Sequence, residues 1–249
     1  FMAGYHHGRI EGRAETLDEF LELSLRQHAA LRSGNPNLKL HCEYVPMANP
    51  EQEARLLKTL IPRFDSFGIN EAEIMRALDS LGFAAEAEEI ARAERSFSLY
   101  HGALRLFREF RLPRLHLHNL GYYIVLIRKP YFISPEAVRR ACLFASAVNA
   151  VKAKRGGAVP REAVGEMAEL PLSEVGFGQL EAFAAEARQA GYPISSDFTA
   201  TGIMEREDHI CVITPAHIVP NPVSTVGMGD TISSAAFAAE VSLGIGGPS

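Results

Sequence analysis

The sequence Gly227-Met228-Gly229-Asp230 combines residue types that could stabilise a transferred phosphoryl group and activate an alcohol. Two glycines allow a tight turn and leave no side chain between a ligand and the amide hydrogens. The small and apolar residues that follow predict a helix, whose first turn would direct partial positive charge to the same place. Asp230 would lie beside that place and could accept a proton from a hydroxyl group. Phosphoryl transfer to an alcohol requires such an anion hole beside a base.

The same four residues also fit a simpler interpretation. A helix can begin after a glycine turn with Asp230 as its N-cap. Short glycine motifs are weak evidence when they stand alone. Other groups with related chemistry are needed to separate the two interpretations.

A second candidate group is His41-Cys42-Glu43, in a predicted strand. Because strand side chains alternate, His41 and Glu43 would share one face while Cys42 occupies the other. Glu43 could hold a divalent ion through water, and His41 could orient its carboxylate. A polar pair at the end of a strand, hydrogen-bonded to nearby backbone, would explain the same pattern.

A third group, Asn70-Glu71-Ala72-Glu73, follows the next predicted strand. Asn70 and Glu73 would share one helix face, because residues three apart are neighbours on a helix. Asn70 could bond phosphate oxygens or water, and Glu73 could hold magnesium-bound water. The alternative is a capping box, with Asn at the N-cap and Glu three residues later.

The remaining pattern supplies elements that would position these groups. Helical spacing is found at residues 17–31, 52–60, 71 onward, 84–110 with a break near 96–98, 135–154, 173–190 and after 230. Apolar, β-prone runs predict strands at residues 38–45, 64–69, 115–118, 122–127, 210–213 and 217–219. Because strands alternate with helices, we expect an α/β fold of three layers, with a mostly parallel sheet and helices on both faces. We expect residues 1–249 to form one domain.

Composition limits the partners and the location. The chain has 249 residues, a formal net charge of −5 and three isolated cysteines. Net negative charge argues against a nucleic-acid partner, and the cysteine spacing favours reduced thiols over disulfides or a zinc site. No apolar run reaches the roughly 18 residues of a membrane span, and no signal peptide is recognisable. We therefore expect a cytoplasmic protein without a membrane partner, and the sequence does not indicate its oligomeric state.

Together, the motifs resemble those of the ADP-dependent sugar kinases, the glucokinases and phosphofructokinases of the ribokinase-like superfamily. The family's HxE, NxxE and GxGD motifs stand here as His41-Cys42-Glu43, Asn70-Glu71-Ala72-Glu73 and Gly227-Met228-Gly229-Asp230. The HxE motif separates this family from the ATP-using ribokinases, which keep only the other two. The resemblance extends from about residue 1 to 243 and includes the segment from Leu115 to Tyr123, where Asn119 replaces the family's usual Thr.

The resemblance implies a magnesium-dependent reaction of glycolysis. ADP and a sugar, either glucose or fructose 6-phosphate, would give AMP and a sugar phosphate. Asp230 would be the base, the amides of Gly227, Met228 and Gly229 would stabilise the transferred phosphoryl, and Glu43 and Glu73 would hold hydrated Mg²⁺ with Asn70 nearby. Adenine would lie between Tyr122-Tyr123 and Ile218-Val219, although both tyrosines also fit the core.

The N-terminal segment resembles the family's sugar-bordering stretch, which implies that His6 and Arg9 contact the sugar or its phosphate. A solvated loop arginine is the simpler interpretation of Arg9. Family members are much longer before this point, so we expect the chain to be the C-terminal portion of a longer protein, without the sugar-binding lid domain. We expect such a portion to transfer phosphate slowly or not at all by itself.

Two other functions fit the same sequence. An ATP-dependent ribokinase-like carbohydrate kinase would keep the Asp230 mechanism and change the phosphoryl donor, although the HxE motif argues against it. A non-catalytic nucleotide-binding remnant would keep the pocket without the transfer.

Overall fold

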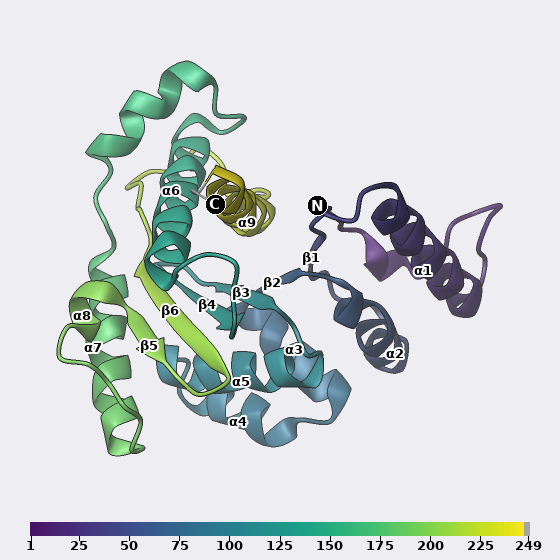
Figure 1. The fold of residues 1–249 in the computed structure, drawn as a ribbon, viewed down its shortest axis with the longest axis horizontal. Coiled ribbons are helices and arrows are strands. Elements are labelled where there is room, and N and C mark those ends of the chain that lie inside the picture. Colours follow the sequence, from purple (N-terminus) through teal and green to yellow (C-terminus); the bar gives the residue numbers. More distant parts are fainter. Residues whose placement is uncertain (247–249) are drawn as a thin grey trace.

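Six strands form the central sheet of the structure, a computed structural model that describes residues 1–246 apart from the side chain of Val164 (Figure 1). Their order across the sheet is β1-β2-β3-β4-β6-β5. The strands are β1 (His41–Glu43), β2 (Ser66–Asn70), β3 (Arg114–His118), β4 (Tyr122–Arg128), β5 (Ile203–Glu205) and β6 (His209–Pro215).

The sheet is mixed, which corrects the expectation of a mostly parallel sheet. β1, β2 and β3 pair in parallel. The pairs β3–β4, β4–β6 and β5–β6 are antiparallel. The physical reason is the short turn between His118 and Tyr122, because a short connection joins antiparallel neighbours whereas a parallel pair needs a long crossover. Four strands, β1, β2, β3 and β6, still share one direction.

Helices cover both faces of the sheet, as expected for a three-layer α/β fold. The helices α6 and α9 pack together and cover one face, while α3, α5 and α7 cover the other and α4 lies outside them (Figure 1). The helices are α1 (Leu17–Gly34), α2 (Pro50–Leu60), α3 (Glu71–Leu81), α4 (Ala84–Arg92), α5 (Ser96–Glu109), α6 (Pro135–Arg155), α7 (Glu174–Gln189), α8 (Phe198–Thr201) and α9 (Met228–Gly246), with short 3-10 segments at Tyr5–His7, Ile61–Arg63 and Arg161–Glu169.

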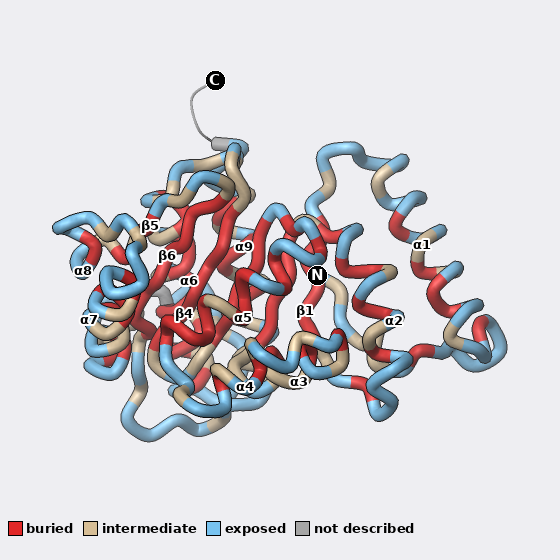
Figure 2. The backbone as a smooth tube through the Cα atoms, turned by 90° about the horizontal axis from the view of Figure 1, so that it is seen from below, coloured by how far each residue is buried: buried red, intermediate tan, exposed pale blue. Residues whose placement is uncertain are grey.

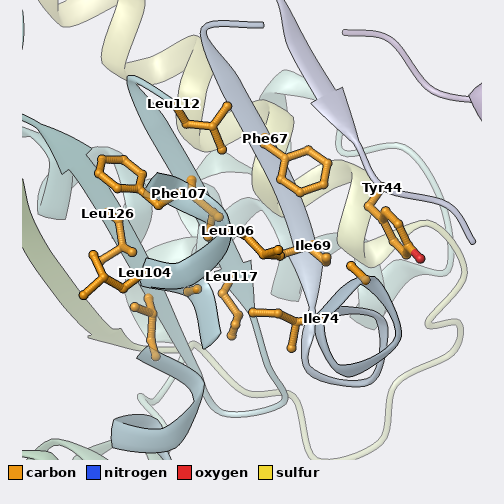
Figure 3. Close-up of a cluster of buried hydrophobic side chains, with 14 of the residues drawn as sticks. Tyr44, Phe67, Ile69, Ile74, Leu104, Leu106, Phe107, Leu112, Leu117 and Leu126 are labelled. Atoms are coloured by element: carbon orange, nitrogen blue, oxygen red, sulfur yellow. The ribbon is translucent and has the colours of Figure 1, made fainter. Parts of the chain in front are cut away.

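The two faces of β1, β2 and β3 differ in chemistry. Alternate residues, among them Cys42, Phe67 and Leu117, enter the large hydrophobic core shared with α3 and α5 (Figure 3). Burial is concentrated in the strands and on the helix faces that meet them (Figure 2). The residues between them face α9 and are mostly polar: His41, Glu43, Ser66, Gly68, Asn70, Arg114, His116 and His118. A buried polar layer therefore lies under α9.

Local signals explain where the helices begin and end. Five helices begin after an N-cap residue whose side chain accepts hydrogen bonds from first-turn amides. These residues are Thr16, Asn49, Asn70, Ser134 and Ser173. Left-handed glycines follow α3 and α6, at Gly82 and Gly156. Within residues 1–246, no helix is both long and apolar enough to cross a membrane.

Most predicted elements are confirmed, with boundary shifts of a few residues. The expected break within residues 84–110 is present, but it lies at residues 93–95, between α4 and α5, and not at 96–98. Residues 217–219 do not form a sheet strand. Among residues 1–246, His217 forms a single isolated bridge, with Leu172, and the amide of Ile218 donates to the carbonyl of Pro171.

Candidate active site

The polar motifs meet at the carboxyl ends of the parallel strands. β1, β2 and β3 end at Glu43, Asn70 and His118, and Asn70 is the register partner of His118. The first turn of α9, which contains the Gly-x-Gly-Asp sequence, lies over the same edge. Ligands of α/β proteins bind at this edge of the sheet. The three motifs, distant in sequence, therefore form one site.

Glu43 is buried beneath α9, and both of its carboxylate oxygens are occupied. His118 Nε2 donates to Oε1 over 2.7 Å, and Ser233 Oγ donates to Oε2 over 2.5 Å. Burial by itself would raise the pKa of Glu43, but the hydrogen bonds from His118 and His41 outweigh it and hold the pKa at about 2. Burial would lower the pKa of His118, but the hydrogen bond to Glu43 and its charge raise it. Together these shifts favour an ionised, buried Glu43–His118 pair.

A chain of hydrogen bonds connects this pair to the polar layer. Arg114 donates to Ser66 over 2.9 Å, and the Oγ of Ser66 lies 2.8 Å from Nδ1 of His41. Nε2 of His41 lies 3.1 Å from Ser233 Oγ. Burial lowers the pKa of His41, which favours the neutral ring needed in such a chain. His41 thus positions Ser233 and Glu43, as predicted for the HxE motif.

Two glycines leave room for the buried pair. A Cβ at residue 229 would lie 2.7 Å from Cε1 of His118. A Cβ at residue 68 would overlap the Oε2 atom of Glu43. Both distances are below normal carbon contact, so Gly68 and Gly229 allow α9 to approach β1, β2 and β3 closely.

The turn before α9 presents open amides beside Asp230. Gly227 has a φ of 66°, in the left-handed region that glycine tolerates. The amide of Met228 donates to Thr225, whereas those of Gly229 and Asp230 make no backbone hydrogen bond within residues 1–246. Asp230 is exposed in the first turn. This arrangement leaves two open amides beside an accessible carboxylate, and their role as an anion hole stays a prediction.

Lys152 adds a positive charge to this turn. Its Nζ donates to the carbonyl of Val226 over 2.5 Å. A Cβ at Gly227 would lie 3.2 Å from Nζ and 3.8 Å from Oδ2 of Asp230, so all three groups are close. The ammonium group can both hold the turn and attract an anionic ligand.

Asn70 and Glu73 form the capping box of α3. Oδ1 of Asn70 accepts from the amides of Ala72 and Glu73, while Oε2 of Glu73 accepts from the amide of Asn70 over 3.0 Å. The capping interpretation is therefore correct, and it leaves Oε1 of Glu73 without a hydrogen bond among the described residues. Burial raises the pKa of Glu73 to about 7. A cation would favour ionisation of this carboxyl.

The side chains that could bind a metal ion, Glu43 and Glu73, fit such an ion only in part. Within residues 1–246, no three acidic, His or Cys side chains are grouped as ligands. Glu43 is enclosed, so water-mediated contact with a cation requires displacement of a present hydrogen bond. Glu73 has one oxygen available. Magnesium binding by Glu43 and Glu73 stays a prediction.

A pocket of about 550 Å³ adjoins the turn. Its lining includes six predicted residues, Asn70, Tyr123, Ile218, Val219, Met228 and Gly229, together with His118, Asn149, Ser173 and His217. It lies between the first turns of α3 and α9, the β3–β4 turn and the segment after β6. The pocket lining thus contains the predicted nucleotide-binding residues apart from Tyr122. Of the predicted catalytic and metal-binding residues it contains Met228 and Gly229, but not Gly227, Asp230, Glu43 or Glu73.

Tyr122 does not line the pocket, which corrects its predicted contact with adenine. Strand alternation places it in the hydrophobic core on the opposite face of β4 from Tyr123. His6 and Arg9 also lie outside the lining. Met2 pairs in parallel with Cys42, so the chain runs past the carboxyl end of β1 before reaching them.

Sequence reasoning missed four residues that the structure places at the site. They are His118, Ser233, Lys152 and Asn149. His118 alternates with Leu117 and ends a strand, as Glu43 does, and this signal could have identified it. Lys152 and Asn149 lie inside a long helix, where helical periodicity does not reveal which side faces a pocket.

Comparisons with known proteins show the family of the chain. Residues 1–239 match the ADP-specific phosphofructokinase/glucokinase conserved region. The chain belongs to this family. The α/β fold and the family predicted from the three motifs are therefore confirmed.

Two members of the ADP-specific phosphofructokinase/glucokinase family show how similar the sequences are and how much of each chain the similarity covers. The chain is 30% identical over 244 residues to the ADP-specific phosphofructokinase of Methanosarcina acetivorans, which covers 96% of this chain and 49% of that protein. It is 32% identical over 207 residues to the ADP-dependent glucose/glucosamine kinase of Pyrococcus furiosus, covering 82% and 42% respectively.

A solved structure described as an ADP-dependent kinase in complex with fructose-6-phosphate and ADPbetaS is also similar. It superposes with a TM-score of 0.89 at 32% identity, covering 96% of this chain and 52% of that one. The chain therefore spans about half the length of the family members that it matches.

Proposed function

We propose that this chain carries the nucleotide site and transfer centre of an ADP-dependent sugar kinase. The enzyme would move the β-phosphoryl group of ADP to glucose or fructose 6-phosphate and release AMP, in the cytoplasm and as part of glycolysis. The observation that supports this most strongly is the open-amide turn at the start of α9, with Asp230 beside it and the pocket next to it.

The residues of the turn have separable roles in this proposal. Asp230 takes the proton from the sugar hydroxyl as the new P–O bond forms. The amides of Gly229 and Asp230 stabilise the charge on the transferred phosphoryl group, assisted by the ammonium of Lys152. The buried Glu43–His118 pair holds the turn in place through Gly229.

Tyr123 and the Ile218-Val219 segment would provide apolar walls for adenine, since all three residues line the same pocket. Glu73 would hold Mg²⁺ through its free oxygen, with Glu43 behind it. The ion would neutralise part of the charge on the diphosphate. His6 and Arg9 would contact the sugar or its phosphate at the same edge of the sheet.

A single-turnover assay tests this function. The chain, in excess over ADP labelled in its β-phosphate, is mixed with Mg²⁺ and each acceptor, and labelled sugar phosphate is measured. We expect label to reach glucose or fructose 6-phosphate only slowly, since the chain spans about half of its relatives' length. Asp230→Asn should reduce this rate by about 10²–10⁴-fold. Binding of ADP should change by less than about twofold, because the base acts mainly in the transition state.

Asp79→Asn is the matched control, since Asp79 is exposed on α3, away from the pocket lining. It should leave the transfer rate unchanged. Activity of Asp230→Asn within about tenfold of the wild type would remove Asp230 as the base. Faster transfer from ATP than from ADP would instead favour the ATP-dependent kinase.

A further inference from the structure

Two side chains in the pocket wall have buried polar atoms without partners. Oδ1 of Asn149 and Nδ1 of His217 are buried and make no hydrogen bond within the part of the chain that the structure describes. Both residues line the pocket. Buried polar atoms are normally paired, so two unpaired ones in a single cavity point to an absent ligand.

The two side chains are tied to the same place in the fold. The backbone amide of His217 donates to Ser146 Oγ over 2.7 Å. Ser146 lies one helical turn before Asn149 on α6, so these residues share a helix face. Asn149 is only 2% exposed, which restricts its side chain to this side of the pocket.

Tyr123 lines the same pocket as Asn149, and burial raises the pKa of its phenol to about 12. In the Asn149 amide, Oδ1 is the buried atom without a partner among the described residues. Oδ1 is therefore the acceptor that we assign to a ligand.

His217 supplies a neutral ring to the same pocket lining. Burial lowers the pKa of His217, so near neutral pH its ring has one N–H donor and one acceptor nitrogen. Both atoms are closed off from bulk water, but terminal torsions of Asn and His side chains are broad. Small rotations about these bonds can bring Oδ1 and Nδ1 to a ligand in the pocket.

We propose that Asn149, assisted by His217, reads position 6 of the purine base and makes this pocket selective for adenine. The proposal rests on the proposed function, since it deepens the specificity of the same nucleotide site. Adenine has an amino donor at position 6 beside ring-nitrogen acceptors, which matches an amide oxygen beside an imidazole N–H. Hypoxanthine has a carbonyl acceptor at position 6, which would oppose the Asn149 oxygen.

Calorimetric titration of the 249-residue chain with ADP and with inosine diphosphate tests the proposal. The two ligands differ in the hydrogen-bonding edge of the base and share the ribose and diphosphate. We expect the wild type to bind ADP at least about tenfold more tightly. Asn149→Leu, similar in size but without an acceptor, should weaken ADP binding to the level of inosine diphosphate, whose own affinity should change by less than about twofold. Arg140→Gln, exposed on the same helix, should keep the wild-type ratio.

The outcomes separate this proposal from the proposed function. Equal binding of both nucleotides by the wild type would overturn the selectivity, and this comparison requires no variant to fold. A preference for ADP that persists in Asn149→Leu would overturn the role of Asn149. Failure of the wild type to bind either nucleotide would overturn the nucleotide site itself and this inference with it.

Discussion

Glu43 acts in this structure as a buried anchor beneath the turn of α9. Its oxygens accept from His118 and Ser233, and His118 contacts the place where a Cβ at residue 229 would be. The HxE motif can therefore influence transfer by holding the open amides in position. This explanation does not need Glu43 to reach solvent or a cation.

The Glu43–His118 pair makes stability depend on pH in acid. The pKa of Glu43 is about 2 in the folded chain against 4.5 for an ordinary glutamate, which corresponds to about 3 kcal/mol of stability. Because the folded pKa is lowered, this contribution is complete above about pH 4.5 and is lost as pH falls toward 2. His118, whose pKa is raised from 6.5, is protonated in both states there and does not alter this trend.

Urea unfolding at several pH values measures this contribution. The stability difference between wild type and Glu43→Gln should be large at pH 6 and shrink as the pH is lowered from about 4.5. Glu88→Gln, at an exposed site on α4, should show no such pH-dependent difference. A difference for Glu43→Gln that stays constant down to pH 3 would contradict an ionised Glu43.

Gly229→Ala tests the close approach of α9 to His118. A methyl group 2.7 Å from the imidazole must push the ring or the helix aside, which should disturb the amides of the anion hole. We expect ADP binding to weaken by about tenfold or more, since the diphosphate contacts would be misplaced.

Gly178→Ala provides the matched control for this substitution. Gly178 lies within α7 and an added Cβ meets nothing within 4 Å, so the change should stabilise the helix slightly and leave ADP binding intact. Equal ADP binding by Gly229→Ala and Gly178→Ala would show that the contact with His118 does not shape the site.

At the scale of elements, α9 is fixed over the sheet by a buried ion pair. Arg114 on β3 donates to Glu240 on α9, and the hydroxyl of Tyr131 donates to the same carboxylate over 2.8 Å. Both charged side chains are fully buried. The far part of α9 is thus tied to the strand that ends at His118.

Removal of one partner of the Arg114–Glu240 pair should therefore lower the free energy of unfolding. Glu240→Ala should lower the free energy of unfolding by about 3–5 kcal/mol, because Arg114 would stay buried and unpaired. The double variant Arg114→Met with Glu240→Leu should recover most of this loss. Chemical denaturation checks both values. A loss below about 1 kcal/mol for Glu240→Ala would show that the pair does not hold α9.

The helices and strands also show which structural features the sequence predicts and which it does not. Helical periodicity and capping residues located α1, α2, α3, α6 and α7 closely, because these signals are local. Strand direction was wrong around β4 because pairing depends on the turn at residues 119–121 and not on the pattern within a strand. β5 was missed because three residues provide too short a pattern.

Among site residues, motif spacing succeeded where strand ends carry the chemistry. His41, Glu43, Asn70 and Gly229 lie together as predicted, since parallel strands bring their carboxyl ends to one edge. Tyr122 and Tyr123 are adjacent, and only the final orientation of β4 decides which one faces the pocket. Asn149 and Lys152 could not be predicted, because tertiary packing alone turns that face of α6 toward the site.

At the scale of the whole molecule, the described residues form a sheet with a hydrophobic core on each face and the site at the carboxyl ends of β1, β2 and β3. The segment from α1 to α2 lies beside β1 at the far end of the sheet from β5 (Figure 1). The nucleotide pocket lies nearer the middle of the sheet, between the first turns of α3 and α9. Nucleotide binding can therefore be measured on this chain independently of sugar transfer.

Calorimetric binding of ADP, AMP and ATP with Mg²⁺ to this chain tests the central claim most directly. We predict that ADP and AMP bind more tightly than ATP, because the family uses ADP as its donor and the pocket ends at the anion hole of α9. Tighter binding of ATP would contradict the ADP-dependent assignment. Absence of binding by all three would contradict the claim that this chain contains a formed nucleotide site.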